Sequence, residues 1–388
     1  MWVQLKQLLS LYVLVSVLHV GVAIADSEDR ETEFSSDVLI YSDTDRVMVV
    51  SPQVGIRHAI DEDGGEISAR VVVDAITAAS VDVISNATYR FSEVRSEVGL
   101  SASHAIGKSL PGLSYRGSYE PDYVSHGLTG SWQRELADGD ANFSTSYSLV
   151  LDTISRSGTP TDVFSEKLRT HVLNLGGTQI LDSKTLLRLV YTFTGQFGYM
   201  EKPYRSVPLF DAAGLASGKM AGLSLSNFDR FRLSIKPAEE VPDSRYRHAI
   251  AARGIRYLES WKSSLRLDYR FYIDSWGILA NTVESALYRD FGESLRLYGW
   301  TRFHQQTSAS FWEKTYLVSS SGEIPALRTS DRSLSSSYHL TGGLRAEYDG
   351  DAVDTYMEFS SMYSSFNDFL YLDSRIALIF QGGVRWAF

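Results

Sequence analysis

Apolar and polar side chains alternate along most of the chain after residue 45, and this period of two is the pattern of a β-strand with one buried face. In residues 264–274 the odd-numbered positions from Leu265 to Ile273 are apolar or aromatic. The even-numbered positions from Arg266 to Asp274 are charged, with one tyrosine. Residues 142–153 and 372–388 repeat the arrangement. No long segment has helical periodicity, so the sequence predicts an all-β protein.

Turn-forming sequences separate the alternating runs. Asp138-Gly139-Asp140 and Asp349-Gly350-Asp351 are two examples, and Asp-Gly favours tight hairpin turns. Counting the runs between such turns predicts about fourteen strands, within a range of about 12–16. The predicted strands are 46–60, 66–77, 85–101, 122–136, 141–153, 166–180, 184–198, 245–258, 261–274, 278–290, 293–305, 333–349, 351–364 and 372–388.

The connections between these strands differ in length. Every second connection, counted from the first, has room for a long loop, at 102–121, 154–165, 199–244 and 306–332. Short turns on one side and long loops on the other are typical of an antiparallel up-and-down transmembrane β-barrel, with turns in the periplasm and loops outside the cell. A secreted β-sandwich or β-helix is the alternative. A sandwich does not require long loops on one side, and a solenoid requires a fixed repeat that the sequence lacks.

The N-terminal segment has the features of a secretory signal. Lys6 is followed by an apolar run, Leu8 to Val22, and by the small-residue site Ala23-Ile24-Ala25. An uncleaved anchor helix is the alternative interpretation. We therefore expect a signal peptide at 1–25, an acidic periplasmic arm at 26–45, and one outer-membrane barrel at 46–388.

Composition narrows the class of protein further. The chain has 388 residues, 44% of them hydrophobic, a net charge of −10 and no cysteine. This content is too polar for a bundle of membrane-spanning helices, and the acidic balance argues against nucleic-acid binding. Disulfides and thiolate metal sites are excluded. The 22 Tyr and 7 Trp gather near predicted strand ends, as in the aromatic belts of membrane proteins.

Several segments resemble an outer-membrane family catalogued as domain of unknown function 3570. The strongest run is Tyr269 to Ile278, which contains Arg270-Phe271-Tyr272 and Asp274-Ser275-Trp276 and leads into a strand with the Thr-x-Glu sequence Thr282-Val283-Glu284. Thr301 to Phe311 and the Pro203-Tyr204-Arg205 loop are also similar to that family. The terminal Phe388 resembles the signal that the barrel-assembly machinery recognises. The resemblance implies an outer-membrane barrel but no particular chemistry.

The candidate functional residues are charged side chains expected to face the barrel lumen. Mixed walls of arginine and carboxylate set up a transverse field and a constriction for small solutes. The alternative is that the same pairs only fill and brace a narrow barrel. The candidates are Arg266, Asp268, Arg270, Asp274, Glu284, Arg296, Arg302, Arg345, Glu347, Glu358, Arg375 and Arg385.

Two loop regions add candidates of a different kind. Loop 199–244 carries Pro203, Tyr204 and Arg205, and its length demands a role, either as a constriction inside the lumen or as a lid over it. Its apolar residues keep transport of a hydrophobic solute open. Trp276 lies in a predicted extracellular turn, where we expect it to anchor at the membrane interface, with contact to a ligand as the alternative.

These patterns predict a porin-like channel for small solutes in the outer membrane of a Gram-negative bacterium. A closed scaffold barrel that binds a partner and a hydrophobic-solute transporter are the alternatives. Nothing ties a nucleophile to a base, so we expect no enzyme and no catalytic residues. We also expect no cofactor and no metal. The predicted partners are outer-membrane lipids, the barrel-assembly machinery and small solutes, with no nucleic acid and no assignable oligomer.

Overall fold

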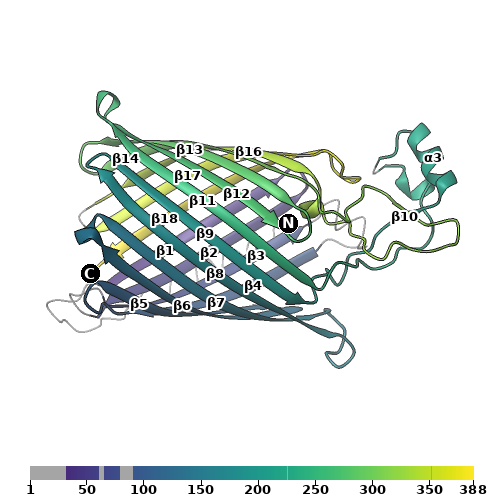
Figure 1. Ribbon diagram of the computed structural model, residues 1–388, viewed down its shortest axis with the longest axis horizontal. Coiled ribbons are helices and arrows are strands. Elements are labelled where there is room, and N and C mark those ends of the chain that lie inside the picture. Colours follow the sequence, from purple (N-terminus) through teal and green to yellow (C-terminus); the bar gives the residue numbers. More distant parts are fainter. Residues whose placement is uncertain (1–31, 61–64, 79–90, 225, 351) are drawn as a thin grey trace, which may run out of the picture.

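The computed structural model describes residues 32–60, 65–78, 91–224, 226–350 and 352–388. The described residues form a closed antiparallel barrel of sixteen strands, in which β1 pairs with β18 (Figure 1). The predicted signal peptide at 1–25 lies outside the described residues. The barrel strands are β1 (Thr32–Asp43), β2 (Val47–Ala59), β3 (Glu66–Ala78), β4 (Phe91–Ser103), β5 (Ser109–Glu120), β6 (Tyr123–Leu136), β7 (Ala141–Ser155), β8 (Ser165–Asp182), β9 (Thr185–Gly198), β11 (Ser244–Leu258), β12 (Ser263–Asp274), β13 (Leu279–Phe291), β14 (Leu295–Gln306), β16 (Ser337–Tyr348), β17 (Val353–Phe366) and β18 (Ser374–Ala387).

Two strands were missed by the sequence pattern, and the predicted number of about fourteen was too low. Residues 32–43 belong to β1 rather than to a periplasmic arm, so the barrel begins at Thr32 and not at residue 46. Their charged residues conceal the alternation because Asp37 and Asp43 share the inward face with Leu39 and Tyr41. Residues 109–120 form β5 inside the predicted loop 102–121, and Pro111 and two glycines interrupt the alternation there.

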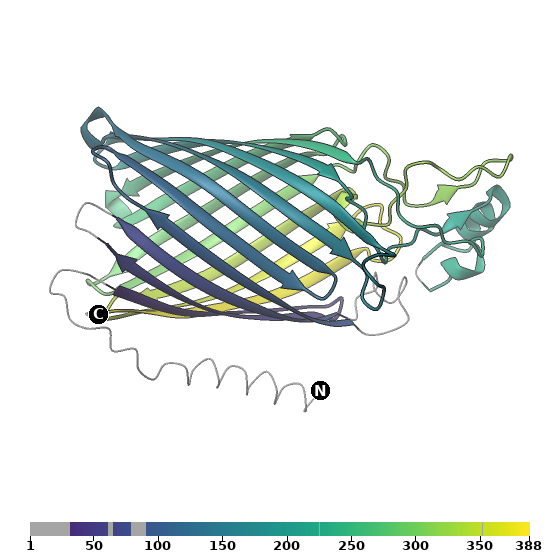
Figure 2. The ribbon, with the colours of Figure 1, turned by 90° about the horizontal axis from the view of Figure 1, so that it is seen from below.

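The two ends of the barrel differ as predicted. At one end, here called the turn end, short connections such as 183–184 and 292–294 join the strands, and Thr32 pairs with Phe388 through N–H···O bonds of 3.0 and 2.9 Å. At the other, the loop end, lie the long connections 199–243 and 307–336 (Figures 1 and 2). The two missed strands leave the direction of all later strands unchanged, so the predicted long loops after residue 153 do share one end.

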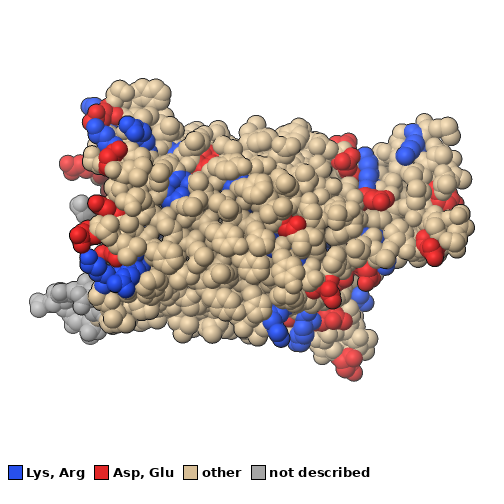
Figure 3. Space-filling model, viewed as in Figure 1, with Lys and Arg blue, Asp and Glu red and all other residues tan. Residues whose placement is uncertain are grey.

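The outer surface between the ends is apolar. On β12 the exposed outward positions are Leu265, Leu267, Tyr269 and Ile273. Charged side chains gather at the two ends of the visible face and leave a middle band almost free of them (Figure 3). Three outward histidines are hydrogen-bonded to tyrosines on adjacent strands, which satisfies their polar atoms on an apolar surface. These pairs are Tyr115–His126, Tyr147–His171 and Tyr191–His248, at 2.7–2.8 Å.

The long loops form a folded layer beyond the loop end. Segment 199–243 contains β10 (Leu209–Phe210) and α3 (Ala212–Met220), and β10 pairs in parallel with β15 (Tyr316–Leu317) of segment 307–336. Asp211 caps α3 by accepting the Gly214 N–H at 2.6 Å. Short 3-10 turns lie at Ala137–Gly139, Phe228–Arg230, Glu259–Trp261 and Arg332–Leu334. None of the helices in the described part of the chain is both long and apolar enough to cross a membrane.

Candidate functional site

All twelve charged residues predicted to line the lumen lie on the inward face of their strands. The alternation with exposed apolar neighbours fixes this assignment. On β12, for example, Arg266, Asp268, Arg270 and Asp274 alternate with the exposed positions from Leu265 to Ile273. The structure brings these candidates into separate groups rather than one continuous ring.

The largest group is a network of ion pairs across β11–β14. Arg253 makes two hydrogen bonds to Asp268, at 2.7 and 2.8 Å, in the two-pronged geometry that guanidinium favours. Glu284 accepts from Arg302 Nε at 2.6 Å and also from Arg266. Arg266 Nε also lies 3.3 Å from Asp268. Asp268 and Glu284 are therefore each paired with two arginines, and Arg266 is shared between them.

A cavity of about 630 Å³ adjoins this network inside the lumen. Four arginines and two carboxylates line it, together with His304 and His339. Among the described residues, no carboxylate lies within ion-pair distance of two of the arginines, Arg188 and Arg270. Arg188 is not among the predicted lumen residues, although its position between Leu187 and Leu189 on an alternating strand is the signal that marks it as inward.

We call the charged lining of β9–β14, apart from the Arg296–Asp290 pair beside the turn end, the basic wall because arginines outnumber carboxylates there. Its carboxylates are Asp268, Asp274 and Glu284. Its arginines are Arg188, Arg245, Arg247, Arg253, Arg266, Arg270 and Arg302.

A second charged lining lies on β3–β7, about six strands away around the barrel and so on roughly the opposite side. We call this lining, apart from Glu66 and Glu135 beside the turn end, the acidic wall. Its arginines are Arg70, Arg95 and Arg116, and its carboxylates are Asp74, Glu93, Glu97, Glu120, Asp122 and Asp152. Sequence reasoning missed this wall, although the alternation of Val94, Val98 and Leu100 with charged residues would have revealed it.

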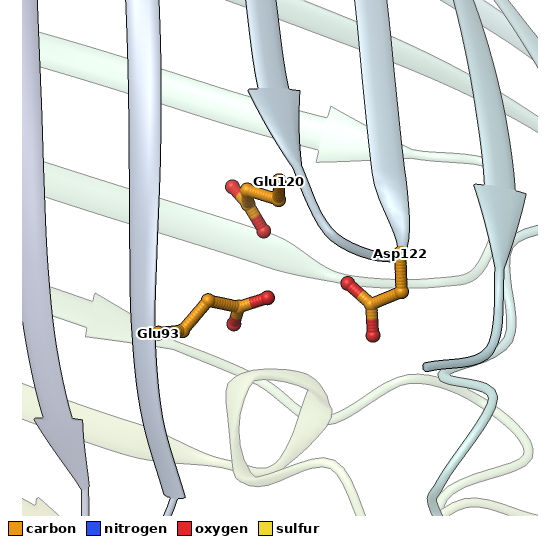
Figure 4. A group of neighbouring side chains, drawn as sticks. All are labelled: Glu93, Glu120 and Asp122. Atoms are coloured by element: carbon orange, nitrogen blue, oxygen red, sulfur yellow. The ribbon is translucent and has the colours of Figure 1, made fainter. Parts of the chain in front are cut away.

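Arginines neutralise only part of the acidic wall. Arg95 Nε lies 2.6 Å from Asp74. Glu97 accepts hydrogen bonds from Arg116 at 2.5 Å and from Arg70 at 3.4 Å. Nearer the loop end, Glu93, Glu120 and Asp122 point toward one another, with oxygens within 4.8 Å (Figure 4). Carboxylate oxygens are the ligands that Ca²⁺ and Mg²⁺ accept. If any group of described residues holds a divalent cation, these three side chains have the required chemistry.

The remaining lumen candidates lie on β14–β18 and form local pairs. Arg345 contacts Glu347 at 2.8 Å and Glu358 at 3.6 Å, and Arg296 lies 3.9 Å from Glu347. At the loop end Arg375 lies 3.3 Å from Asp43. Arg385 is exposed to the lumen near the turn end, opposite Asp354 in the strand register.

Trp276 was predicted to anchor at the membrane interface, and this prediction is wrong. Its side chain is 5% exposed and packs in a core with Phe210, Trp312 and Phe369. The indole N–H donates to the Ser244 carbonyl at 2.9 Å, and the Arg245 guanidinium lies 4.2 Å from the ring centre. The turn that carries it folds under the long loops, so the tryptophan joins their core instead of facing lipid.

The loop candidates Pro203, Tyr204 and Arg205 lie at the base of segment 199–243. Arg205 contacts Asp331 at 2.5 Å and Glu239 at 3.4 Å, which ties the two long loops together. Burial raises the pKa of the Glu239 carboxyl despite the nearby Arg205. Burial acts in the same direction on Asp331, but Arg205 and the Ser333 N–H and hydroxyl outweigh it and hold the pKa of Asp331 below its usual value. Tyr204 donates to Asp122 at 2.6 Å.

Segment 199–243 does not fold down into the barrel. Its helix and strand project beyond the loop end (Figure 2). Only the base of the segment, including Lys202 and Glu239, lines a cavity of about 320 Å³ shared with Arg245 and Arg247. The lumen at the level of Arg270 is therefore shaped by the side chains of the barrel wall, and the loop narrows only the mouth.

An apolar outer band, a charged interior and a closed antiparallel sheet define the class of outer-membrane β-barrels. A bacterial polysaccharide outer-membrane secretin has a similar fold, with a TM-score of 0.52 and 7% identity over 94% of this chain and 100% of that one. CdiB from Acinetobacter baumannii gives 0.49 and 11%, over 92% of this chain and 60% of CdiB. A loop-deletion mutant of OmpT from Vibrio cholerae gives 0.40 and 8%, over 93% and 98%.

The chain belongs to the family described as protein of unknown function DUF3570, whose model matches residues 86–352. This match confirms the resemblance inferred from the segments around Tyr269 and Thr301. No curated protein matches the chain.

Proposed function

We propose that this protein is a porin-like channel of the bacterial outer membrane that passes small hydrophilic solutes. The observation that carries the proposal is the sixteen-stranded closed barrel with charged side chains on its inner face. Barrels of about 16–18 strands are wide enough to leave an aqueous channel, whereas barrels of about eight strands are filled by their own side chains. The loop end then faces the cell exterior and the turn end faces the periplasm.

The distribution of charge supports selection by binding within the lumen rather than catalysis. The basic wall and the acidic wall lie on roughly opposite sides, an arrangement that sets a field across the channel. The cavity of about 630 Å³ gives space for a small solute beside the basic wall. We propose no enzymatic role and no cofactor for this site.

The two alternatives rest on other observations. Ion pairs such as Arg253–Asp268 brace neighbouring strands and would also suit a closed scaffold. A hydrophobic-solute transporter is less well supported, because the aromatic core of the long loops, including Phe210 and Trp312, is buried. The exposed apolar side chains of these loops, such as Met220 and Ile235, are the observation that keeps this alternative. We therefore propose the hydrophilic channel as the main function.

Single-channel recording tests the proposal. Protein purified from the outer membranes of bacteria producing the full chain would be added to a planar bilayer. We expect discrete current steps that grow with salt concentration, and none from a heat-unfolded sample of the same preparation. A silent bilayer that contains folded protein, verified by its β-sheet circular dichroism, would overturn the channel and favour the scaffold.

A further inference from the structure

The cavity beside the basic wall has an uneven balance of charge. Asp268 is engaged by Arg253, and Glu284 by Arg302 and Arg266. These ion pairs leave Arg188 and Arg270 as cavity-lining arginines without a carboxylate within ion-pair distance in the described part of the chain. Both side chains are exposed to the lumen.

The strand register places these two arginines around a small residue. Arg188 is opposite Arg253, and Arg270 is opposite Ala251, on the strand that lies between them. Ala251 and the neighbouring Val190 both line the cavity, and their short side chains leave open space between the guanidinium groups. On the far side of Arg270, Thr282 adds a hydroxyl that is hydrogen-bonded to His304 at 2.8 Å.

A third arginine lies toward the mouth on the same wall. Arg247 lines the cavity of about 320 Å³ at the loop end, and its buried Nε has no hydrogen-bond partner among the described residues. A buried N–H donor without an acceptor is costly, so this group favours a ligand that brings an acceptor. Arg247 and Arg270 lie on adjacent strands, with Arg247 nearer the loop end, so the unpartnered Nε of Arg247 and the guanidinium of Arg270 lie at successive depths of the channel.

We infer that the basic wall binds small oxyanions, carboxylates or phosphates, at a site formed by Arg188 and Arg270, with Arg247 as the outer contact. Guanidinium groups match the planar oxygens of carboxylate and phosphate and keep their charge at every physiological pH. The carboxylates of the acidic wall repel the same solute, so it stays near the arginines. This inference rests on the proposed channel function and names the class of solute that the channel selects.

The test compares ion selectivity in two double variants. Arg188→Gln/Arg270→Gln removes the two lumen charges. The control, Arg256→Gln/Arg289→Gln, removes the same number of positive charges from outward positions near the turn end. Arg256 is opposite the exposed Leu265, and Arg289 is opposite the exposed Leu297. Reversal potentials in a KCl gradient report the chloride-to-potassium permeability ratio.

We expect the unmodified channel to favour chloride, and we expect the lumen variant to lower that ratio at least about threefold, since each removed charge acts at short range in a partly screened site. The outward variant should keep the original ratio. Inorganic phosphate and succinate, added in turn, should block chloride current in the outward variant and block much less in the lumen variant. The stronger blocker of the two identifies which oxyanion the site prefers.

A conducting lumen variant with unchanged selectivity and unchanged block would overturn the inference while the channel function stands. The opposite case is a protein that binds oxyanions but does not conduct. Calorimetric titration of phosphate and of succinate into detergent-solubilised protein detects it. If the bilayer is silent but one of these anions binds, and binding is lost only in the lumen variant, the oxyanion site stands and the channel fails. If neither anion binds in the calorimeter or blocks current, the oxyanion site is wrong.

Discussion

The basic wall and the acidic wall are built by the same alternation of inward and outward side chains, yet they use their carboxylates differently. On the basic wall Asp268, Asp274 and Glu284 are each held by arginine, and the surplus charge is left on arginines. On the acidic wall arginines hold Asp74 and Glu97, whereas Glu93, Glu120 and Asp122 face one another and, within the described residues, only Glu120 has an arginine, Arg95, at 4.0 Å. Carboxylates on the basic wall therefore stabilise the barrel, whereas Glu93, Glu120 and Asp122 of the acidic wall repel one another.

Removing a carboxylate from the basic wall should have the largest effect on stability. The Asp274 side chain is fully buried and accepts hydrogen bonds from Arg245, Tyr272 and the N–H groups of Trp276 and Ile278. Asp274→Ala leaves Arg245 buried without its partner, and we expect a loss of about 3–5 kcal/mol in the free energy of unfolding. Urea unfolding in detergent, followed by tryptophan fluorescence, measures it.

The conservative variant Asp274→Asn serves as the control for Asp274→Ala. It keeps the shape and the acceptor oxygen but not the charge, and it should lose less stability than the alanine variant. A loss below about 1 kcal/mol in Asp274→Ala would contradict the structural role, because that is the range of an exposed ion pair.

The matching change on the acidic wall should have a smaller effect. The Glu97 side chain is 6% exposed, but its two ion-pair partners, Arg70 and Arg116, are 51% and 59% exposed. Glu97→Ala removes hydrogen bonds to a charged group, yet both arginines can be solvated by lumenal water. We expect a loss of about 1–2 kcal/mol in the same urea assay. A loss equal to that of Asp274→Ala would mean that the two walls do not differ in this respect.

The smallest effect should have the opposite sign. Glu93 lies among like charges, and no arginine or lysine is within ion-pair distance of it in the described residues. Glu93→Gln relieves the repulsion, so we expect a gain of about 0.5 kcal/mol in stability at low salt. The gain should disappear at about 1 M NaCl, where the Debye length falls to about 3 Å. Destabilisation by Glu93→Gln at low salt would show that the cluster is not a site of repulsion.

The alternation of side chains by itself determined the fold class and the faces of the strands. Outward apolar and inward charged positions can be read locally, because a strand turns its side chains to opposite sides at each step. The sequence therefore identified an outer-membrane-type barrel, its two kinds of connection, its family and the twelve inward charges. It also placed the long loops after residue 153 at one end.

Only the tertiary structure decided what depends on pairing between distant strands. Strands β1 and β5 are held in the sheet by their neighbours, although charges in β1 and glycine and proline in β5 hide their pattern. Trp276 is buried because loops far away in sequence fold over it. The register places Arg188 beside Arg253 and gathers Glu93, Glu120 and Asp122 from different segments. Which charges are neutralised and which remain free is thus set by register and barrel closure, and these are long-range properties that a local pattern does not encode.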